Sequence, residues 1–210
     1  MNSQVIDPAL IRHAVPERIL TPRLVLARDA VADAAALRAA VTASHAQLAP
    51  WLSWVIPVFD LAEAVRTQRR AIEYWDAGDS FQWRLWWRAG HPAPFASART
   101  RARPASPSAT ARPLPFVGSI DLHTIDWAAR TAELGYWLHT PAAGLGLMAE
   151  AGPHVLRVAF ELLGFTQLTI RCHPDNTRSL ATARRLGFTL RSTDADGAIC
   201  LTRTAMEHRS

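Results

Sequence analysis

The sequence predicts a mixed α/β fold in which consecutive strands form hairpins. Strand-like and helix-like stretches follow the order β-α-α-β and then β-β-α-β-α-β-β, which differs from the strict alternation of a doubly wound sheet. Of the 210 residues, 49% are hydrophobic, enough for one sizeable core. There is no internal repeat. We therefore expect a single domain over residues 16–205.

The first half of this domain is expected to hold a strand, two helices and a second strand. The stretch RILTPRLVLARDA is typical of a strand with a proline near its start. Residues 30–44 are rich in alanine and apolar at helical spacing. Residues 60–78 form a second helix, with Asp60 as N-cap, Glu63 completing a capping box and Gly78 as the stop. The stretch SFQWRLWWR (80–88) then alternates as a strand does.

The second half is expected to begin with two strands, FVGSIDLHTID and AELGYWLH (132–139), joined by a turn. A helix over 146–164 follows; it has an apolar stripe, and Pro153 is expected to kink it or to mark a one-turn shift in its start. FTQLTIRCH (165–173) is a strand, and PDNTRSLATARRLGF begins a helix at Asn176. A hairpin whose turn contains Asp196-Gly197 closes the chain.

Residues 89–115 contain six prolines and no hydrophobic period, which predicts a flexible insert. The insert extends a hairpin or, alternatively, forms a basic flap over a site. Its four arginines account for most of the positive charge, because without them the net charge falls from +5 to +1. The basic charge is therefore local, and we do not expect nucleic acid as a partner.

The sequence lacks membrane spans, a secretory signal and metal-ligand spacing, and these absences set our expectations for compartment and metal content. No apolar run reaches the roughly 18 residues that a membrane-spanning helix needs, and the first residues do not resemble a secretory signal. Cys172 and Cys200 lie far apart without metal-ligand spacing. We expect a cytoplasmic protein with reduced cysteines, no metal and no membrane partner.

Gly144 and Gly146 stand between a predicted strand and a predicted helix, in the stretch HTPAAGLGLMAEA. Glycine lets a ligand approach the main chain closely, and the free N–H groups at a helix start bind anions. The pair therefore indicates a phosphate cradle, although it lacks the third glycine and the later acidic residue of a dinucleotide fingerprint.

Asn176 and Ser179 lie three residues apart at the start of the next helix. This spacing is typical of ordinary capping. It would also let both side chains face the ligand held by the glycine turn, because the two helices follow neighbouring strands.

Residues 118–188 resemble the GNAT acyl-CoA N-acyltransferases, in particular the branch of ribosomal-protein N-terminal acetyltransferases. The resemblance lies in GSIDLH, AELGYWL, GLGLMAEA and AFELLGFTQLTIRCHPDNTRSLATARRLGF. TPRLVLAR, LAPWLSW and GDSFQWRLW are also similar to that branch. The resemblance implies a central twisted, mostly antiparallel sheet that is flanked by helices and splayed between two parallel strands.

The resemblance also implies acetyl-CoA as cosubstrate, with its pyrophosphate on the N–H groups of Gly144, Leu145, Gly146, Leu147 and Met148. The N–H of Leu138 would polarise the thioester carbonyl. Asn176 would contact the pantetheine arm, and Ser179 would donate to the leaving thiolate. Glu133 is the candidate base, or else a structural salt-bridge residue.

This chain departs from the family pattern at the glycine turn. Pro141 stands at the first position of the motif, and Leu145 stands where a basic residue is common. Both changes remove positive charge near the expected phosphates.

The expected partners are acetyl-CoA and a primary amine, and the protein is expected to be a monomer or homodimer. The acceptor is the N-terminal amine of a protein or, alternatively, a small amine such as a polyamine, an amino acid or an antibiotic. A non-catalytic acyl-CoA sensor is a further alternative. Six of the eight tryptophans fall between 51 and 87, where they pack the core or wall the acceptor pocket.

Overall fold

The structure is a computed structural model that describes residues 14–90, 115–195 and 197–209. Almost all of the predicted insert 89–115 lies outside the described residues. The elements before it are β1 (Arg18–Leu20), β2 (Leu24–Arg28), η1 (Val31–Asp33), α2 (Ala34–Leu48), α3 (Leu61–Ala77) and β3 (Phe81–Trp87). Those after it are β4 (Phe116–Asp126), β5 (Thr131–Leu138), η3 (Thr140–Ala142), α4 (Leu147–Arg157), η4 (Val158–Leu162), β6 (Gln167–Cys172), α5 (Thr177–Arg185), β7 (Thr189–Thr193), β8 (Ile199–Thr204) and α6 (Ala205–Arg209).

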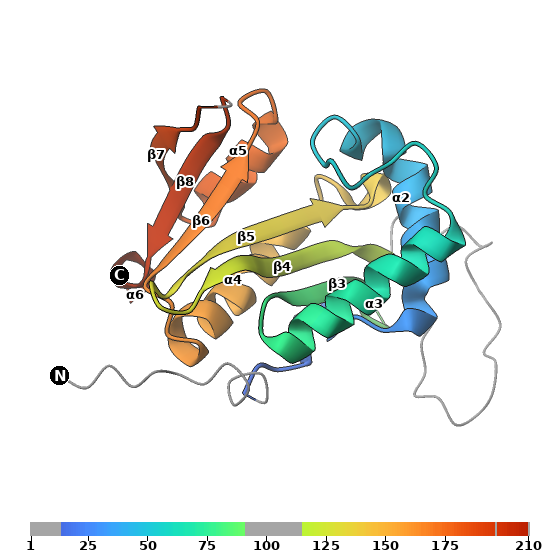
Figure 1. Ribbon diagram of the computed structural model, residues 1–210, viewed down its shortest axis with the longest axis horizontal. Helices are drawn as coiled ribbons and strands as arrows, with labels where there is room; N and C mark the ends of the chain where they lie inside the picture. Colours follow the sequence, from blue (N-terminus) through green and yellow to red (C-terminus); the bar gives the residue numbers. More distant parts are fainter. Residues whose placement is uncertain (1–13, 91–114, 196, 210) are drawn as a thin grey trace.

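All eight strands belong to one sheet, in the order β1-β2-β3-β4-β5-β6-β8-β7. Every neighbouring pair is antiparallel except β5 and β6, which are parallel. These two pair only from Thr131–Gln167 to Glu133–Thr169, and beyond that point they diverge (Figure 1). The mixed fold with splayed parallel strands that the sequence predicted is therefore confirmed.

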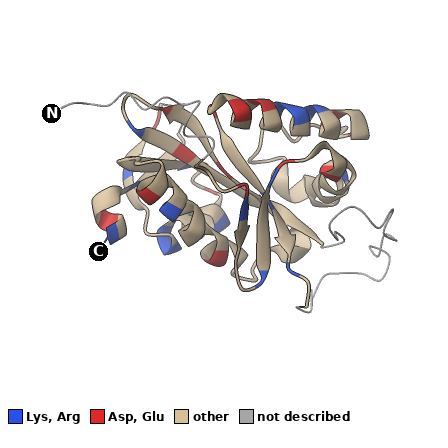
Figure 2. Cartoon of the chain, turned by 90° about the horizontal axis from the view of Figure 1, so that it is seen from below, with Lys and Arg blue, Asp and Glu red and all other residues tan. Residues whose placement is uncertain are grey.

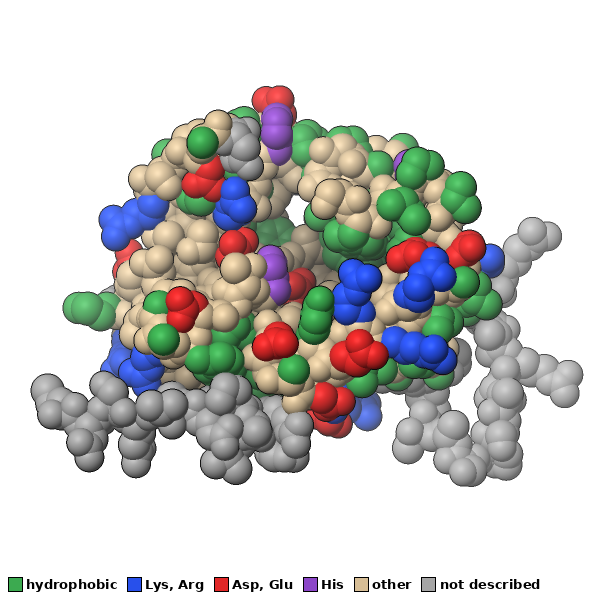
Figure 3. Space-filling view, in the orientation of Figure 1, with side chains coloured by type: hydrophobic (Ala, Val, Ile, Leu, Met, Phe, Trp, Pro, Cys, Tyr) green, Lys and Arg blue, Asp and Glu red, His purple; other side chains and the backbone are tan. Residues whose placement is uncertain are grey.

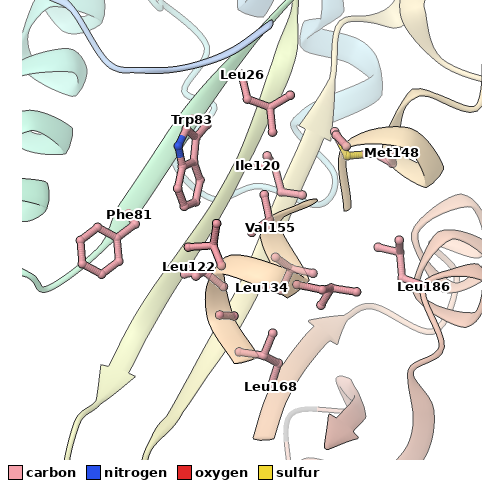
Figure 4. Packing of buried hydrophobic residues seen from close by; sticks show 14 of the residues in the cluster. Leu26, Phe81, Trp83, Ile120, Leu122, Leu134, Met148, Val155, Leu168 and Leu186 are labelled. Carbon is pink, nitrogen blue, oxygen red and sulfur yellow. The ribbon is translucent and has the colours of Figure 1, made fainter. Parts of the chain in front are cut away.

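Helices cover both faces of the sheet (Figure 1). On one face, α4 and α5 pack through a large cluster that includes Leu134, Val155 and Leu186 (Figure 4). On the other face, α2 and the start of α3 pack against a second cluster that includes Trp86 and Trp137. Alternate β5 residues thus face opposite helical layers, as strand geometry requires.

The structure confirms the helix ends at which we predicted a capping residue. The Asp60 side chain accepts a hydrogen bond from the Glu63 N–H, and Gly78 ends α3 in the left-handed region at φ 77°. Asn176 caps α5. The predicted first strand proved to be two, because a turn in which the Thr21 N–H donates to the Leu24 carbonyl folds β1 back onto β2.

Acidic and basic positions are interspersed over the helices in Figure 2, without separation by sign. Within the described residues, no helix combines the length and apolar character needed to cross a membrane.

Candidate active site

The turn before α4 is built on two glycines with left-handed backbone. Gly144 has φ 81° and Gly146 has φ 73°, so both positions would strain any residue with a side chain. Gly146 is the N-cap of α4 and provides no side-chain hydrogen bond to it. The first N–H groups of this eleven-residue helix therefore lack a side-chain cap, as an anion site requires.

A cavity of about 650 Å³ begins at this turn and extends along the parted strands. Its walls come from β5, the glycine turn, α5 and the end of α2 with the following loop. In the orientation of Figure 1, the surface is hollowed between the half that carries β6–β8 and the half that carries α2 and α3 (Figure 3). The divergence of β5 and β6 thus opens an accessible site.

The structure brings most of the predicted site residues together. Five of them line the cavity: Leu138, Gly144, Met148, Asn176 and Ser179. Leu147 is fully buried in the core, so only its backbone is available to a ligand. Leu145 and Gly146 belong to the same turn, although they are not among the lining residues.

The backbone of Leu138 is oriented toward the gap between the strands. The N–H of the next residue, His139, donates to the Val117 carbonyl on the β4 side. Because successive N–H groups of a strand point in opposite directions, the Leu138 N–H points away from β4. This is the direction expected of a donor to a thioester carbonyl in the cavity.

Three hydrogen-bonding groups converge at the start of α5. The Asn176 side chain accepts from the Ser179 N–H at 3.2 Å, so it is a cap as well as a cavity residue. The Tyr136 hydroxyl of β5 lies 2.9 Å from the Ser179 carbonyl oxygen and 3.2 Å from Ser179 Oγ. Sequence analysis missed Tyr136, although its place in the strand AELGYWLH puts it on the same face as Leu138.

Arginines distant in sequence supply positive charge that the glycine motif lacks. Arg23 donates from Nη1 to the Leu145 carbonyl at 3.0 Å and pairs through Nε with Glu150 at 2.6 Å. Arg178 and Arg185 line the cavity from α5. Sequence analysis did not identify these two arginines. Their spacing of seven residues, which places them on one face of the helix, is the signal that could have found them.

Two contacts join α5 and its preceding loop to α2 and the loop after it. The rings of Trp51 and His173 lie 5.5 Å apart, and Arg178 Nη1 donates to Gln47 Oε1 at 3.4 Å. Of the tryptophans between 51 and 87, four are buried, whereas Trp51 and Trp54 remain 39% and 38% exposed. Most of this group therefore packs the core, and Trp51 is its one member that lines the cavity, together with Trp137 of β5.

Glu133 lies apart from the cavity, at the last paired position of β5 and β6. It shares the α2 and α3 side of the sheet with His123 of β4, whose Nε2 is 3.7 Å from Glu133 Oε2. His123 Nδ1 is 2.8 Å from Asp121 Oδ2. Burial lowers the pKa of His123, but the Asp121 and Glu133 carboxylates outweigh burial and raise that pKa above its usual value.

Replacing His123 with Gln is expected to remove a pH-dependent contribution to stability. Because the folded-state pKa of His123 is raised, its contribution is fully present below the unfolded pKa of about 6.5 and is lost as pH rises through the folded value. The difference in unfolding free energy between wild type and His123→Gln should therefore be larger at low pH than at high pH. Urea titrations across this range measure it; a difference independent of pH would contradict the assignment.

Among the described residues, no group of three or more His, Cys, Asp or Glu side chains is arranged to hold a metal ion. The site offers backbone N–H groups, hydroxyls and guanidinium groups. These groups suit a phosphorylated ligand.

Comparison with known families identifies the class of protein to which this fold belongs. Residues 23–189 match the model of the acetyltransferase (GNAT) domain family. The chain belongs to this family.

Two curated relatives match part of the chain. YdaF of Bacillus subtilis (strain 168), provisionally named a ribosomal N-acetyltransferase, is 34% identical over 80 residues, which cover 38% of this chain and 44% of YdaF. The ribosomal-protein-serine acetyltransferase of Escherichia coli (strain K12) is 31% identical over 75 residues, 36% of this chain and 42% of that protein. The chain thus spans less than half the length of either relative.

Solved structures agree in fold. RimL, the ribosomal L7/L12 alpha-N-protein acetyltransferase, solved with coenzyme A in a disulfide with a cysteine, superposes with a TM-score of 0.73 at 20% identity. The match covers 90% of this chain and 98% of that one. The microcin C7 self-immunity acetyltransferase MccE, solved with acetyl-CoA and AMP, has a TM-score of 0.72 at 18% identity, covering 94% and 99%.

Proposed function

We propose that this protein is an acetyl-CoA-dependent N-acetyltransferase that modifies the N-terminal amine of a protein. The observation that carries the proposal is the cavity between the parted strands, which has the Gly144 turn in one wall and Ser179 in another. Family membership supports the reaction class. The names of the two curated relatives, a ribosomal N-acetyltransferase and a ribosomal-protein-serine acetyltransferase, support a protein as the acceptor.

Each group in the cavity has a role in this proposal. The N–H groups of residues 144–148 hold the pyrophosphate, and Asn176 contacts the pantetheine arm. The Leu138 N–H polarises the thioester carbonyl, while the Ser179 hydroxyl donates to the departing sulfur. Arg178 and Arg185 add positive charge along the cavity wall.

Glu133 is proposed as the acceptor of the amine proton. It lies on the face of β5 opposite Tyr136 and Leu138, beside His123. Leu138 lies five residues beyond Glu133, a distance of about 16 Å along the strand. The proton therefore has to reach Glu133 through water, and the amine has to attack in its neutral form.

The test is calorimetric titration with acetyl-CoA and with CoA, followed by a transfer assay on peptides with Ser or Ala at the N-terminus. We expect micromolar binding of acetyl-CoA and a peptide acetylated at its N-terminus, detected by mass spectrometry. The same peptide with a blocked N-terminus and an internal lysine is the matched control. Ser179→Ala should lower turnover and leave acetyl-CoA affinity within about 2-fold, because one hydrogen bond made only in the transition state is lost.

The other outcomes identify different functions. Transfer to a polyamine but to no peptide would indicate a small-molecule acetyltransferase. Binding without transfer to any amine would indicate an acyl-CoA sensor. Absence of binding would refute both the enzyme and the sensor.

A further inference from the structure

Tyr136 crosses the gap that opens between β5 and β6. It stands three residues beyond Glu133, the last β5 residue that pairs with β6, and its side chain lines the cavity. Its hydroxyl meets Ser179 of α5 rather than any residue of its own strand. This residue thus links the two walls of the cavity at the position proposed for the thioester sulfur.

The pattern of hydrogen bonds fixes where each proton points. A carbonyl oxygen can only accept, so the Tyr136 phenol donates its one proton to the Ser179 carbonyl at 2.9 Å. The phenol oxygen retains lone pairs, and Ser179 Oγ lies 3.2 Å from it. The Tyr136 hydrogen bond therefore fixes the backbone of Ser179, and the Ser179 hydroxyl beside it keeps its one proton for an acceptor in the cavity.

We propose that Tyr136 is a positioning residue, whose hydroxyl holds the backbone of Ser179 in place so that the Ser179 hydroxyl can donate to the sulfur that leaves the acetyl group. The inference rests on the proposed function. In the step, the amine nitrogen forms a bond to the carbonyl carbon, and the C–S bond breaks with its electron pair retained by sulfur. Ser179 stabilises that thiolate by a hydrogen bond and keeps its own proton. The proton lost by the amine passes through water to Glu133, as proposed above.

The pKa values of the Tyr136 phenol and of a thiol indicate that the phenol keeps its proton in a hydrogen bond and does not transfer it. Burial raises the pKa of Tyr136 to about 12, whereas a thiol has a pKa of about 8.5. Transfer of the phenol proton to the thiolate would therefore be unfavourable. Tyr136 remains a neutral donor throughout the reaction and acts through Ser179.

The test compares Tyr136→Phe in two backgrounds. In the wild type, loss of the hydroxyl should lower kcat about 10-fold, since one orienting hydrogen bond is removed, with KM for acetyl-CoA within about 2-fold. In the Ser179→Ala background, the same change should have no further effect on kcat. Tyr74→Phe is the matched control, because Tyr74 is the only other tyrosine and is 47% exposed on α3.

Other outcomes overturn the inference. An equal loss of kcat in both backgrounds would mean that the hydroxyl acts independently of Ser179. An unchanged kcat, or a change confined to KM, would mean that Tyr136 contributes only to binding or packing. Thermal unfolding of each variant excludes a folding defect as the cause. If the wild type itself transfers no acetyl group, the proposed function fails, and that result is distinct from all of these.

Discussion

Replacing Gly146 with Glu is expected to weaken acetyl-CoA binding by at least about 100-fold. The carboxylate would stand at the start of α4, where the proposed pyrophosphate sits. Two like charges about 4 Å apart near a protein surface repel by up to about 4 kcal/mol, which exceeds a 100-fold effect. Isothermal titration calorimetry with acetyl-CoA measures the change directly.

Two control variants separate charge from backbone strain. Gly146→Ala imposes the left-handed backbone on an L-residue, which costs about 1–2 kcal/mol, without adding charge. Gly197→Glu places the same carboxylate at another left-handed glycine, which has open space around it and lies outside the cavity. If Gly146→Glu binds acetyl-CoA as tightly as Gly197→Glu does, the phosphate cradle is not at this turn.

Replacing Arg84 with Met should destabilise the fold by about 3–5 kcal/mol, because it leaves a buried carboxylate without its partner. Arg84 is 1% exposed and Asp29 is 6% exposed, and Arg84 Nε lies 2.6 Å from Asp29 Oδ1. Arg84 Nη2 also donates to Gln68 Oε1 at 2.7 Å. Urea unfolding gives the free energy by linear extrapolation.

The unfolding free energy of Arg84→Met should also depend on pH. Burial raises the pKa of Asp29 to about 6, and loss of the Arg84 charge would raise it further. A raised carboxyl pKa favours the folded state at low pH and disfavours it as pH rises through the folded value. The unfolding free energy of Arg84→Met should therefore fall more steeply than that of wild type between pH 5 and pH 8.

Arg66→Met is the matched control for this experiment. Arg66 pairs with Glu63 on α3, and its side chain is 61% exposed. Exposed pairs contribute about 0–1 kcal/mol, so this variant should unfold nearly as the wild type does. Equal destabilisation of the two variants would show that burial of the Arg84 pair has no special effect.

Features set by neighbouring residues could be predicted from the sequence. Asp60 and Gly78 bound α3 because their caps act within one turn of the chain. The glycine turn was predictable for the same reason. The division of the first strand into β1 and β2 was not, because both parts are strand-like and only their antiparallel pairing separates them.

Features that depend on distant partners could not be predicted. Arg84 pairs with Asp29 across 55 residues, and nothing near Arg84 in sequence indicates that its charge is buried. Tyr136 and Ser179 are 43 residues apart, and their contact arises from the way α5 docks beside β5. The guanidinium that contacts the glycine turn belongs to Arg23, which precedes that turn by more than a hundred residues.

The contacts of Arg23 and Thr21 with Glu150 tie the start of α4, where we propose that acetyl-CoA binds, to the first hairpin of the chain. The Arg23 N–H and guanidinium both bond the Glu150 carboxylate, and Thr21 donates to it as well, across 127 and 129 residues of chain. Closing so long a loop is slow and is opposed by chain entropy until later contacts form. During synthesis, Arg23 emerges long before the glycine turn, and its contacts with Leu145 and Glu150 form only when α4 docks on the hairpin of β1 and β2. An acetyl-CoA molecule bound at the finished turn would hold the earliest and the later parts of the chain together.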